Sequence, residues 1–157
     1  MSEAETPVAP AWGMKPITEG EWTGWSMWSS DPFELHAGPF YSRKEADGGV
    51  LCAFRAEPRH MNGGGFMHGG CLMTFADYAL FAIAGESLSG GGSVTVSLSG
   101  EFLDSVGPGA RVEARGEVTR AGGSLVFIRG LITSEGRSLM TFSGVVKKMR
   151  RRDGHGA

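Results

Sequence analysis

The sequence predicts a single α+β domain in which an antiparallel sheet curls around one long helix. Residues 71–84 are apolar almost all the way round, and a helix of that kind is normally buried. Two segments of strand character precede this helix and four follow it. One helix cannot cover both faces of a sheet, so we expect the sheet to wrap around it. A length of 157 residues suits one domain with its own core.

The N-terminal residues 1–35 are expected to form a partly loose extension, because residues 1–20 mix Pro, Ala, Glu and Thr without periodicity. Trp22, Trp25 and Trp28 follow at spacings of three, which suits one face of a short helix. We expect these aromatic side chains to close over an edge of the core. Stacking on a ligand is the alternative.

A short helix is predicted where Asp31 and Pro32 supply an N-cap and a proline at the first helical position. This helix should end near Gly38. Strands are expected at 40–44 and 49–55, joined by a turn that contains two glycines. The long helix follows from about 70 to 86.

The segments after the long helix alternate between apolar and polar residues, or are apolar on both faces, and are separated by tight turns. We expect these strands to form a meander, which leaves a sheet edge or face that a second copy of the chain would cover. The final residues 150–157 are expected to form a basic, frayed tail. The four strands are expected at 94–102, 112–119, 125–133 and 139–147.

Composition excludes several classes of function. A net charge of −2 and a pI of about 6.1 argue against a nucleic-acid binder, which usually carries a strong basic excess. Two cysteines, Cys52 and Cys71, do not make a disulfide framework and fit a reducing compartment. The acidic start lacks the apolar run of a signal peptide, and the segment 71–84 is too short to span a bilayer. We therefore expect a cytoplasmic protein with no membrane partner.

Asp77 is the strongest single candidate for catalysis, because it is a lone carboxylate in the apolar helix. Burying an unpaired charge is costly, so this side chain must find partners, shift its pKa or take part in chemistry. A carboxylate in that position can act as a base or as a nucleophile. The structural alternative is a buried Asp that bonds to Thr74 or Tyr78.

A second group of candidates lies where the long helix begins. The first N–H groups of a helix have no partner within it, and Gly69 and Gly70 would let a substrate oxygen approach them closely. This corner could stabilise a carbonyl oxygen that gains negative charge in the transition state. The amide of Asn62 and the ring of His68 could donate to the same substrate. The structural alternatives are a loop Asn bonded to its own backbone and a His that caps the loop.

Asp77 lies eight residues after Gly69, about 12 Å away at the rise of an α-helix. One chain therefore cannot bring both groups to the same carbon atom, and a shared site would have to join two chains. Thr95 lies on the following strand and could help to hold a water molecule near Asp77. Its alternative is an ordinary strand threonine.

The sequence gives little support to a zinc site, to nucleotide hydrolysis or to a serine hydrolase. Cys52, His60, His68 and Cys71 do not follow the spacings of usual zinc sites, so no metal is expected. The glycines at 63–65 lack the Lys-Ser/Thr of a P-loop. No serine has the context of a nucleophile elbow.

The pattern of Asn62, His68-Gly69-Gly70 and Asp77 resembles the hotdog-fold acyl-CoA thioesterases. The branch it is most similar to is the phenylacetic-acid-degradation type, which is related to the hydroxybenzoyl-CoA thioesterases. The resemblance covers roughly residues 38–148 and implies a hotdog thioesterase domain over 36–149.

The resemblance also implies roles for these residues. The N–H of Gly69 and the amide of Asn62 would polarise the thioester carbonyl, and His68 would interact near the sulfur or the carbonyl. Asp77 of the other subunit would activate water or attack directly, with assistance from Thr95. Coenzyme A would be the leaving thiol and part of the substrate, so no cofactor or metal is implied.

The acyl group stays open between aryl and medium-chain types. Phe81 stands where another branch of the family has a site Thr, which suggests a more apolar pocket. Gly70, Phe66 and Met67 are the other candidates for substrate binding, although core packing is the alternative for the apolar ones. A homodimer and a dimer of dimers both fit. The alternatives in function are a hotdog hydratase or dehydratase of enoyl or hydroxyacyl thioesters, and a non-catalytic acyl-CoA binding module.

Overall fold

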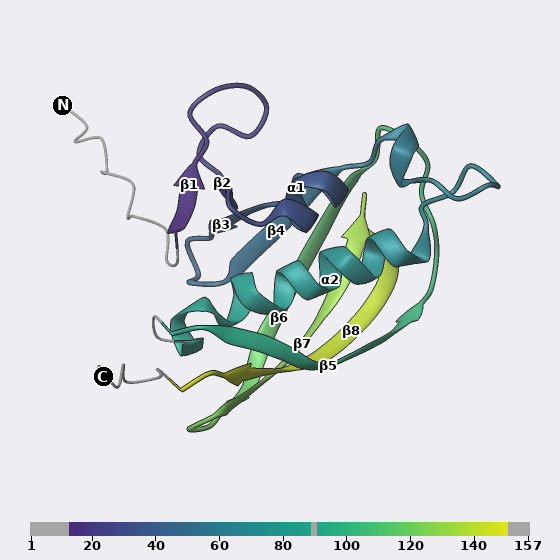
Figure 1. The fold of residues 1–157 in the computed structure, drawn as a ribbon. Helices are drawn as coiled ribbons and strands as arrows, with labels where there is room; N and C mark the ends of the chain where they lie inside the picture. The colour runs from purple at the N-terminus through teal and green to yellow at the C-terminus, as the bar shows by residue number, and fades with distance from the viewer. Residues whose placement is uncertain (1–12, 89–90, 151–157) are drawn as a thin grey trace, which may run out of the picture.

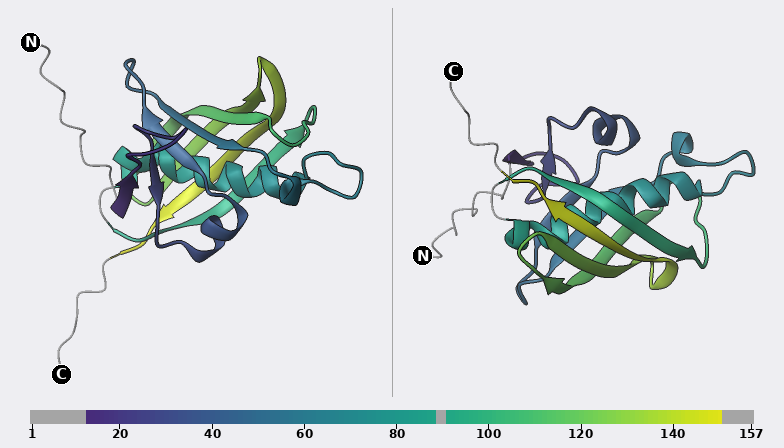
Figure 2. Two further views of the ribbon diagram at one scale, coloured as in Figure 1. Left: turned by 90° about the horizontal axis from the view of Figure 1, so that it is seen from above. Right: turned by 60° about the horizontal axis from the view of Figure 1, so that its bottom comes forward.

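A computed structural model describes residues 13–88 and 91–150 (Figure 1). Its eight strands form one antiparallel sheet in the order β1-β2-β3-β4-β6-β7-β8-β5. The sheet curls around the long helix α2 (Gly69–Ala84), which lies along the concave face in both views of Figure 2. This arrangement confirms the predicted fold class. Parts of the N-terminal extension and almost all of the expected basic tail lie outside the described residues.

The remaining elements agree with most of the predicted segments. Strands expected at 40–44, 49–55, 94–102, 112–119, 125–133 and 139–147 are all present, with ends that differ by a few residues. The elements are β1 (Met14–Pro16), β2 (Ser26–Trp28), α1 (Pro32–Ala37), β3 (Tyr41–Lys44), β4 (Val50–Arg55), η2 (Pro58–His60), η3 (Gly85–Leu88), β5 (Ser93–Phe102), β6 (Arg111–Ala121), β7 (Leu125–Ser134) and β8 (Arg137–Lys148).

Helix α2 forms the centre of the core because its apolar side chains meet the inner face of the sheet. Leu72, Phe75, Ala76 and Leu80 have at most 2% of their surface exposed. The helix packs against β4, β6, β7 and β8. Burial of large apolar side chains of this kind stabilises the fold by about 1.5–3 kcal/mol each.

The length argument against a membrane span is wrong, because α2 and η3 form a continuous run of 20 residues, Gly69–Leu88. This run is long and apolar enough to cross a bilayer by length and composition alone. A core helix passes the same test, and the sheet around α2 accounts for its apolar surface. The run is therefore weak evidence for a membrane segment.

The expected four-strand meander is only partly correct. Strands β6, β7 and β8 do form a meander, but β5 pairs with β8 and β6 pairs with β4. Residues 103–110 carry the chain from the end of β5 back to the side of β4. Strand β5 therefore lies at one end of the sheet order and has a single strand neighbour among the described residues.

The predicted tryptophan helix is wrong. Trp28 lies in β2, whereas Trp22 lies in a turn and Trp25 directly precedes β2. Trp22 and Trp25 are nevertheless buried and form a second, smaller cluster with Leu51 and Ala53. The expectation that they close over an edge of the core is confirmed for these two side chains.

Candidate active site

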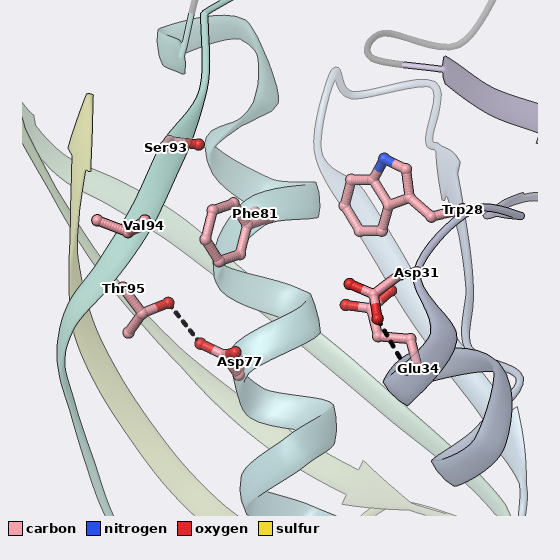
Figure 3. A pocket seen from close by; sticks show the side chains of 8 residues that line it. All are labelled: Trp28, Asp31, Glu34, Asp77, Phe81, Ser93, Val94 and Thr95. Carbon is pink, nitrogen blue, oxygen red and sulfur yellow. Dashed lines mark hydrogen bonds between the residues drawn. The ribbon is translucent and has the colours of Figure 1, made fainter. Parts of the chain in front are cut away.

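Asp77 and Thr95 meet in the structure. Asp77 lies in the middle of α2 and Thr95 near the start of β5. The Thr95 hydroxyl donates a hydrogen bond of 2.6 Å to Asp77 Oδ1 (Figure 3). Thr74, which was the alternative partner for Asp77, instead donates to the Gly70 carbonyl one turn earlier in the helix.

This pair lines a cavity of about 380 Å³ between α2 and β5 on one side and β2 and α1 on the other (Figure 3). Aromatic and aliphatic side chains form part of its wall, and three carboxyl groups and two hydroxyl groups are its polar side chains. The lining residues are Trp28, Asp31, Glu34, Asp77, Phe81, Ser93, Val94 and Thr95.

Glu34 faces this cavity from α1, across from Asp77 (Figure 3). Burial raises the pKa of Glu34 to about 7, and the nearby carboxylates of Asp31 and Asp77 act in the same direction. Both causes disfavour the charged form of a carboxyl group. A substantial share of Glu34 is therefore protonated at neutral pH.

The short helix α1 is held in place at both ends. At its start, Asp31 Oδ1 accepts a hydrogen bond of 3.0 Å from the Glu34 N–H, which is the expected N-cap. At its end, the Arg59 guanidinium donates to the carbonyls of His36 and Gly38. These contacts fix the wall of the cavity that carries Glu34.

His60 adds a further contact to the end of α1. Its Nδ1 accepts a hydrogen bond from the Glu57 N–H at 3.0 Å, so the proton of the neutral ring is on Nε2. Nε2 then donates to the Ala37 carbonyl at 2.8 Å. Burial lowers the pKa of His60, which favours this neutral form.

The loop before α2 holds Asn62. Its Oδ1 accepts hydrogen bonds from the N–H groups of Gly64 at 2.9 Å and Phe66 at 3.2 Å. The structural alternative for Asn62 is therefore realised at the oxygen of its amide. The amide nitrogen has no acceptor among the described residues, and the side chain is exposed, so the donor remains available to a substrate.

His68 caps α2. Its Nδ1 accepts a hydrogen bond of 2.8 Å from the Gly70 N–H, which leaves Nε2 as the donor of the neutral ring. The N–H of Gly70 is thus already used. The N–H of Gly69 has no acceptor in the described part of the chain, so Gly69 supplies the available backbone donor at this helix start.

Gly69 also lies close to Phe102 at the end of β5. A Cβ atom at Gly69 would stand 3.1 Å from Phe102 Cζ, which is tighter than ordinary van der Waals contact. The absence of a side chain at residue 69 lets the aromatic ring approach the start of α2. The two groups of candidates, around Gly69 and around Asp77, stay separated by about 12 Å along the helix.

The candidates for substrate binding have different surroundings. Phe66 is 58% exposed on the loop, and Phe81 lines the cavity. Met67 is only 4% exposed and belongs to the main core cluster, so the alternative of core packing describes it. Its burial gives no support to contact with a substrate.

The two thiols are poorly suited to nucleophilic chemistry. Burial raises the pKa of Cys71 to about 11, and it raises the pKa of Cys52 further. Both side chains are therefore neutral thiols at physiological pH. Among residues 13–88 and 91–150, no group of three or more His, Cys, Asp or Glu side chains is placed to hold a metal ion.

Sequence reasoning missed most of the cavity wall. The sequence places Trp28 at a core edge, with stacking on a ligand as the alternative, Asp31 at a helix cap and Val94 on the apolar face of a strand. It gives no signal for a site role of Glu34 or Ser93. Nothing in the local pattern distinguishes Glu34 from an ordinary acidic residue in the first turn of a helix. Its position opposite Asp77 depends on how α1 packs against α2, which no local spacing encodes.

Comparisons with known proteins identify the family of the chain. A family model described as the thioesterase superfamily matches residues 64–141. The chain is 32% identical over 102 residues to PA0474 of Pseudomonas aeruginosa PAO1, which is named as an esterase without that activity being established. The match covers 64% of this chain and 76% of that protein.

Solved structures are similar as well. A mutant form of the phenylacetic acid degradation protein PaaI from Thermus thermophilus is 30% identical with a TM-score of 0.64, over 76% of this chain and all of that one (100%). A hypothetical thioesterase from Streptococcus pneumoniae TIGR4, determined with coenzyme A, has 23% identity and a TM-score of 0.65, over 73% and 90% of the two chains. The chain belongs to the thioesterase superfamily and has its hotdog fold.

Proposed function

We propose that this protein hydrolyses acyl-CoA thioesters to a free acid and coenzyme A. The observation that carries the proposal is the Asp77 carboxylate, held by Thr95 at 2.6 Å within a cavity large enough for an acyl group. Membership of the thioesterase superfamily supports a thioester as substrate. The coenzyme A bound to the Streptococcus pneumoniae thioesterase supports coenzyme A as the thiol.

In the proposed reaction Asp77 takes a proton from a water molecule, and the water oxygen adds to the thioester carbonyl carbon. The Gly69 N–H and the Asn62 amide donate to the carbonyl oxygen as it gains negative charge. The C–S bond then breaks, the carbonyl re-forms, and coenzyme A leaves as a thiolate that takes up the proton held by Asp77, which regenerates the base. A thiolate is a good leaving group, so one base and one set of oxyanion donors are sufficient.

The proposed site joins two copies of the chain, since Asp77 and Gly69 of one chain are too far apart to act on one carbon. Strand β5 offers the surface for this association. It stands at the end of the sheet order and carries exposed apolar side chains, of which Val94 is 44%, Val96 is 53% and Phe102 is 55% exposed. Large exposed apolar side chains on a sheet edge favour pairing with a second copy.

Aryl and medium-chain acyl groups are both compatible with the cavity. Trp28 and Phe81 offer aromatic surface to a ring, and the same side chains together with Val94 can contact an alkyl chain. We propose a cytoplasmic enzyme that requires no cofactor beyond the coenzyme A portion of its substrate.

The test is thiol release across aryl-, short-, medium- and long-chain acyl-CoAs, measured with a thiol-reactive dye. Asp77→Ala should reduce turnover by about 10²–10⁴-fold, the contribution of a positioned base, while leaving the oligomer intact. Equal turnover in wild type and Asp77→Ala would contradict the assignment. Loss of enoyl absorbance from crotonyl-CoA without thiol release would instead indicate a hydratase, and tight binding of intact acyl-CoA would indicate a binding module.

A further inference from the structure

We propose that Glu34 determines the acyl specificity of the site. Its carboxyl group disfavours the binding of acyl groups that end in a carboxylate, so the substrates are thioesters of uncharged acyl groups. This inference rests on the proposed function, because it concerns the acyl side of the Asp77 cavity. It names the chemical class of the acyl group and assigns a role to a residue on α1.

The geometry of the cavity gives the acyl group a defined path. Asp77 and Thr95 mark the position of the reacting carbon. Beyond them the cavity continues between Phe81, one helical turn after Asp77, and Trp28 on the opposite wall (Figure 3). Glu34 points into the same space from α1, so a chain that extends from the thioester past Phe81 passes its carboxyl group.

The chemistry of the wall favours an uncharged chain. Apolar surface from Trp28, Phe81 and Val94 can replace the water around an alkyl or aryl group. The described residues that line the cavity include no Lys, Arg or His, so a buried substrate carboxylate would lose its hydration without gaining a cationic partner from them. It would also face the carboxyl groups of Asp31 and Glu34, and like charges in a partly buried site repel strongly.

Glu34 is the carboxyl group that can be replaced without removing the cap of α1. Asp31 Oδ1 accepts the Glu34 N–H at the start of α1, so Asp31 also has a structural role. The Glu34 carboxyl has no hydrogen-bond partner among the described residues. The contacts of Arg59 and His60 with the carbonyls at the end of α1 keep the helix against the cavity, so Glu34 is presented from a fixed element.

The charge on Glu34 changes near neutral pH, so the proposal also predicts that the acyl preference depends on pH. The charged and titratable groups nearest to Glu34 are Asp31 at the start of its own helix and Asp77 and Tyr78 on α2, while Arg59 and His60 contact the other end of α1. The carboxyl of Glu34 loses its proton around pH 7. Discrimination against a carboxylate chain should therefore increase between pH 6 and pH 8, roughly one unit either side of that pKa.

The experiment compares acyl-CoAs of equal length that differ only in a terminal carboxylate. Hexanoyl-CoA is paired with adipoyl-CoA, and octanoyl-CoA with suberoyl-CoA. The two chain lengths place the terminal carboxylate at two different distances from the reacting carbon, and so test which length brings it to Glu34. Thiol release gives kcat/KM for wild type, Glu34→Gln and Glu34→Ala. The control is Glu117→Gln, which removes an exposed carboxylate that pairs with Arg129 on β7, outside the cavity.

The kcat/KM of wild type should be higher for the uncharged member of each pair by about tenfold or more. This is the effect expected when the substrate carboxylate and Glu34 repel each other in a partly buried site. Glu34→Gln should raise kcat/KM for adipoyl- or suberoyl-CoA by about tenfold and change the uncharged partners by less than about twofold. Glu117→Gln should behave as wild type. Glu34→Ala, which shortens the side chain, should shift the preference in the same direction.

The experiment distinguishes a failure of the role of Glu34 from a failure of the proposed function. If wild type hydrolyses the uncharged acyl-CoAs and both Glu34 variants keep the wild-type preference, the role of Glu34 is contradicted and the proposed function stands. If wild type hydrolyses no acyl-CoA, neither these four nor the aryl-CoAs of the panel used to test the proposed function, both proposals are contradicted. A preference of wild type for the dicarboxylic acyl-CoAs would also overturn the role of Glu34.

Discussion

Thr95 donates a hydrogen bond of 2.6 Å to Asp77 Oδ1, and this contact joins strand β5 to the centre of helix α2. It holds one carboxylate oxygen, while Asp77 Oδ2 has no partner among the described residues. A carboxylate in this state is oriented and still has an oxygen available for a water molecule. The orientation of the base therefore depends on a strand that also forms the edge of the sheet.

Replacing Thr95 by Val should lower kcat by about tenfold, because a hydrogen bond to a charged group contributes about 1.5–3 kcal/mol. KM should change little, since the hydroxyl contacts Asp77 rather than the apolar wall. Steady-state thiol release with the best acyl-CoA measures both constants. Thr95→Ser keeps the hydroxyl and should recover most of the activity. An unchanged kcat in Thr95→Val would show that the contact does not orient the base.

The positions of Asp77 in the long helix and of Gly69 at its start could be predicted from the sequence, because the signals for both are local. A lone Asp in an apolar helix conflicts with its surroundings, and such a conflict indicates a functional or strained position. The catalytic roles of these residues stay predictions. The period-two pattern around Thr95 predicts its strand but not the neighbours of that strand, so the expected place of β5 is wrong, whereas β6, β7 and β8 form a meander as expected. Glu34 could not be recognised, because its position depends on the packing of α1 against α2.

Gly69→Ala should reduce kcat/KM, because the new Cβ would stand 3.1 Å from Phe102 Cζ. Either the ring or the start of α2 must move, and a displaced Gly69 N–H weakens the stabilisation of the oxyanion. Because the Ala variant keeps the N–H, the loss should stay below the roughly 10²–10³-fold effect of removing one oxyanion donor.

The double variant Gly69→Ala/Phe102→Ala tests the cause of that loss. Removing the ring gives the Cβ room, so Gly69→Ala should reduce activity less in the Phe102→Ala background than in wild type. Phe102→Ala alone is measured as well, because a double-mutant cycle requires the effect of each single substitution on kcat/KM. Independent, additive effects of the two substitutions would contradict the steric explanation.

Glu34 should also make folding stability depend on pH. Its folded pKa of about 7 lies above the ordinary value of 4.5, so the folded state binds more protons than the unfolded state between these values. Stability from this group is therefore fully present below about pH 4.5 and decreases as the pH rises to about 7. Glu34→Gln removes the titrating group and should gain in Tm relative to wild type as the pH is raised.

Thermal unfolding of wild type, Glu34→Gln and Glu117→Gln at pH 5 and pH 8 checks this expectation. The difference in Tm between Glu34→Gln and wild type should be larger at the higher pH. Glu117 is exposed and paired with Arg129, so its variant corrects for the general loss of a surface carboxylate. A difference that is the same at both pH values would contradict the raised pKa of Glu34.

Mixing two inactive variants should restore activity if the site joins two chains. Asp77→Asn removes the base, and Asn62→Asp removes the amide donor while keeping the oxygen that accepts from Gly64 and Phe66. In a mixed dimer, one of the two sites combines the intact Asp77 of one chain with the intact Asn62 of the other. Random exchange of subunits makes half of the dimers mixed, so activity should recover to about a quarter of wild type. A site within one chain would instead leave the mixture at the mean of the two residual activities, and subunit exchange, followed with a tag on one variant, shows that mixed dimers have formed.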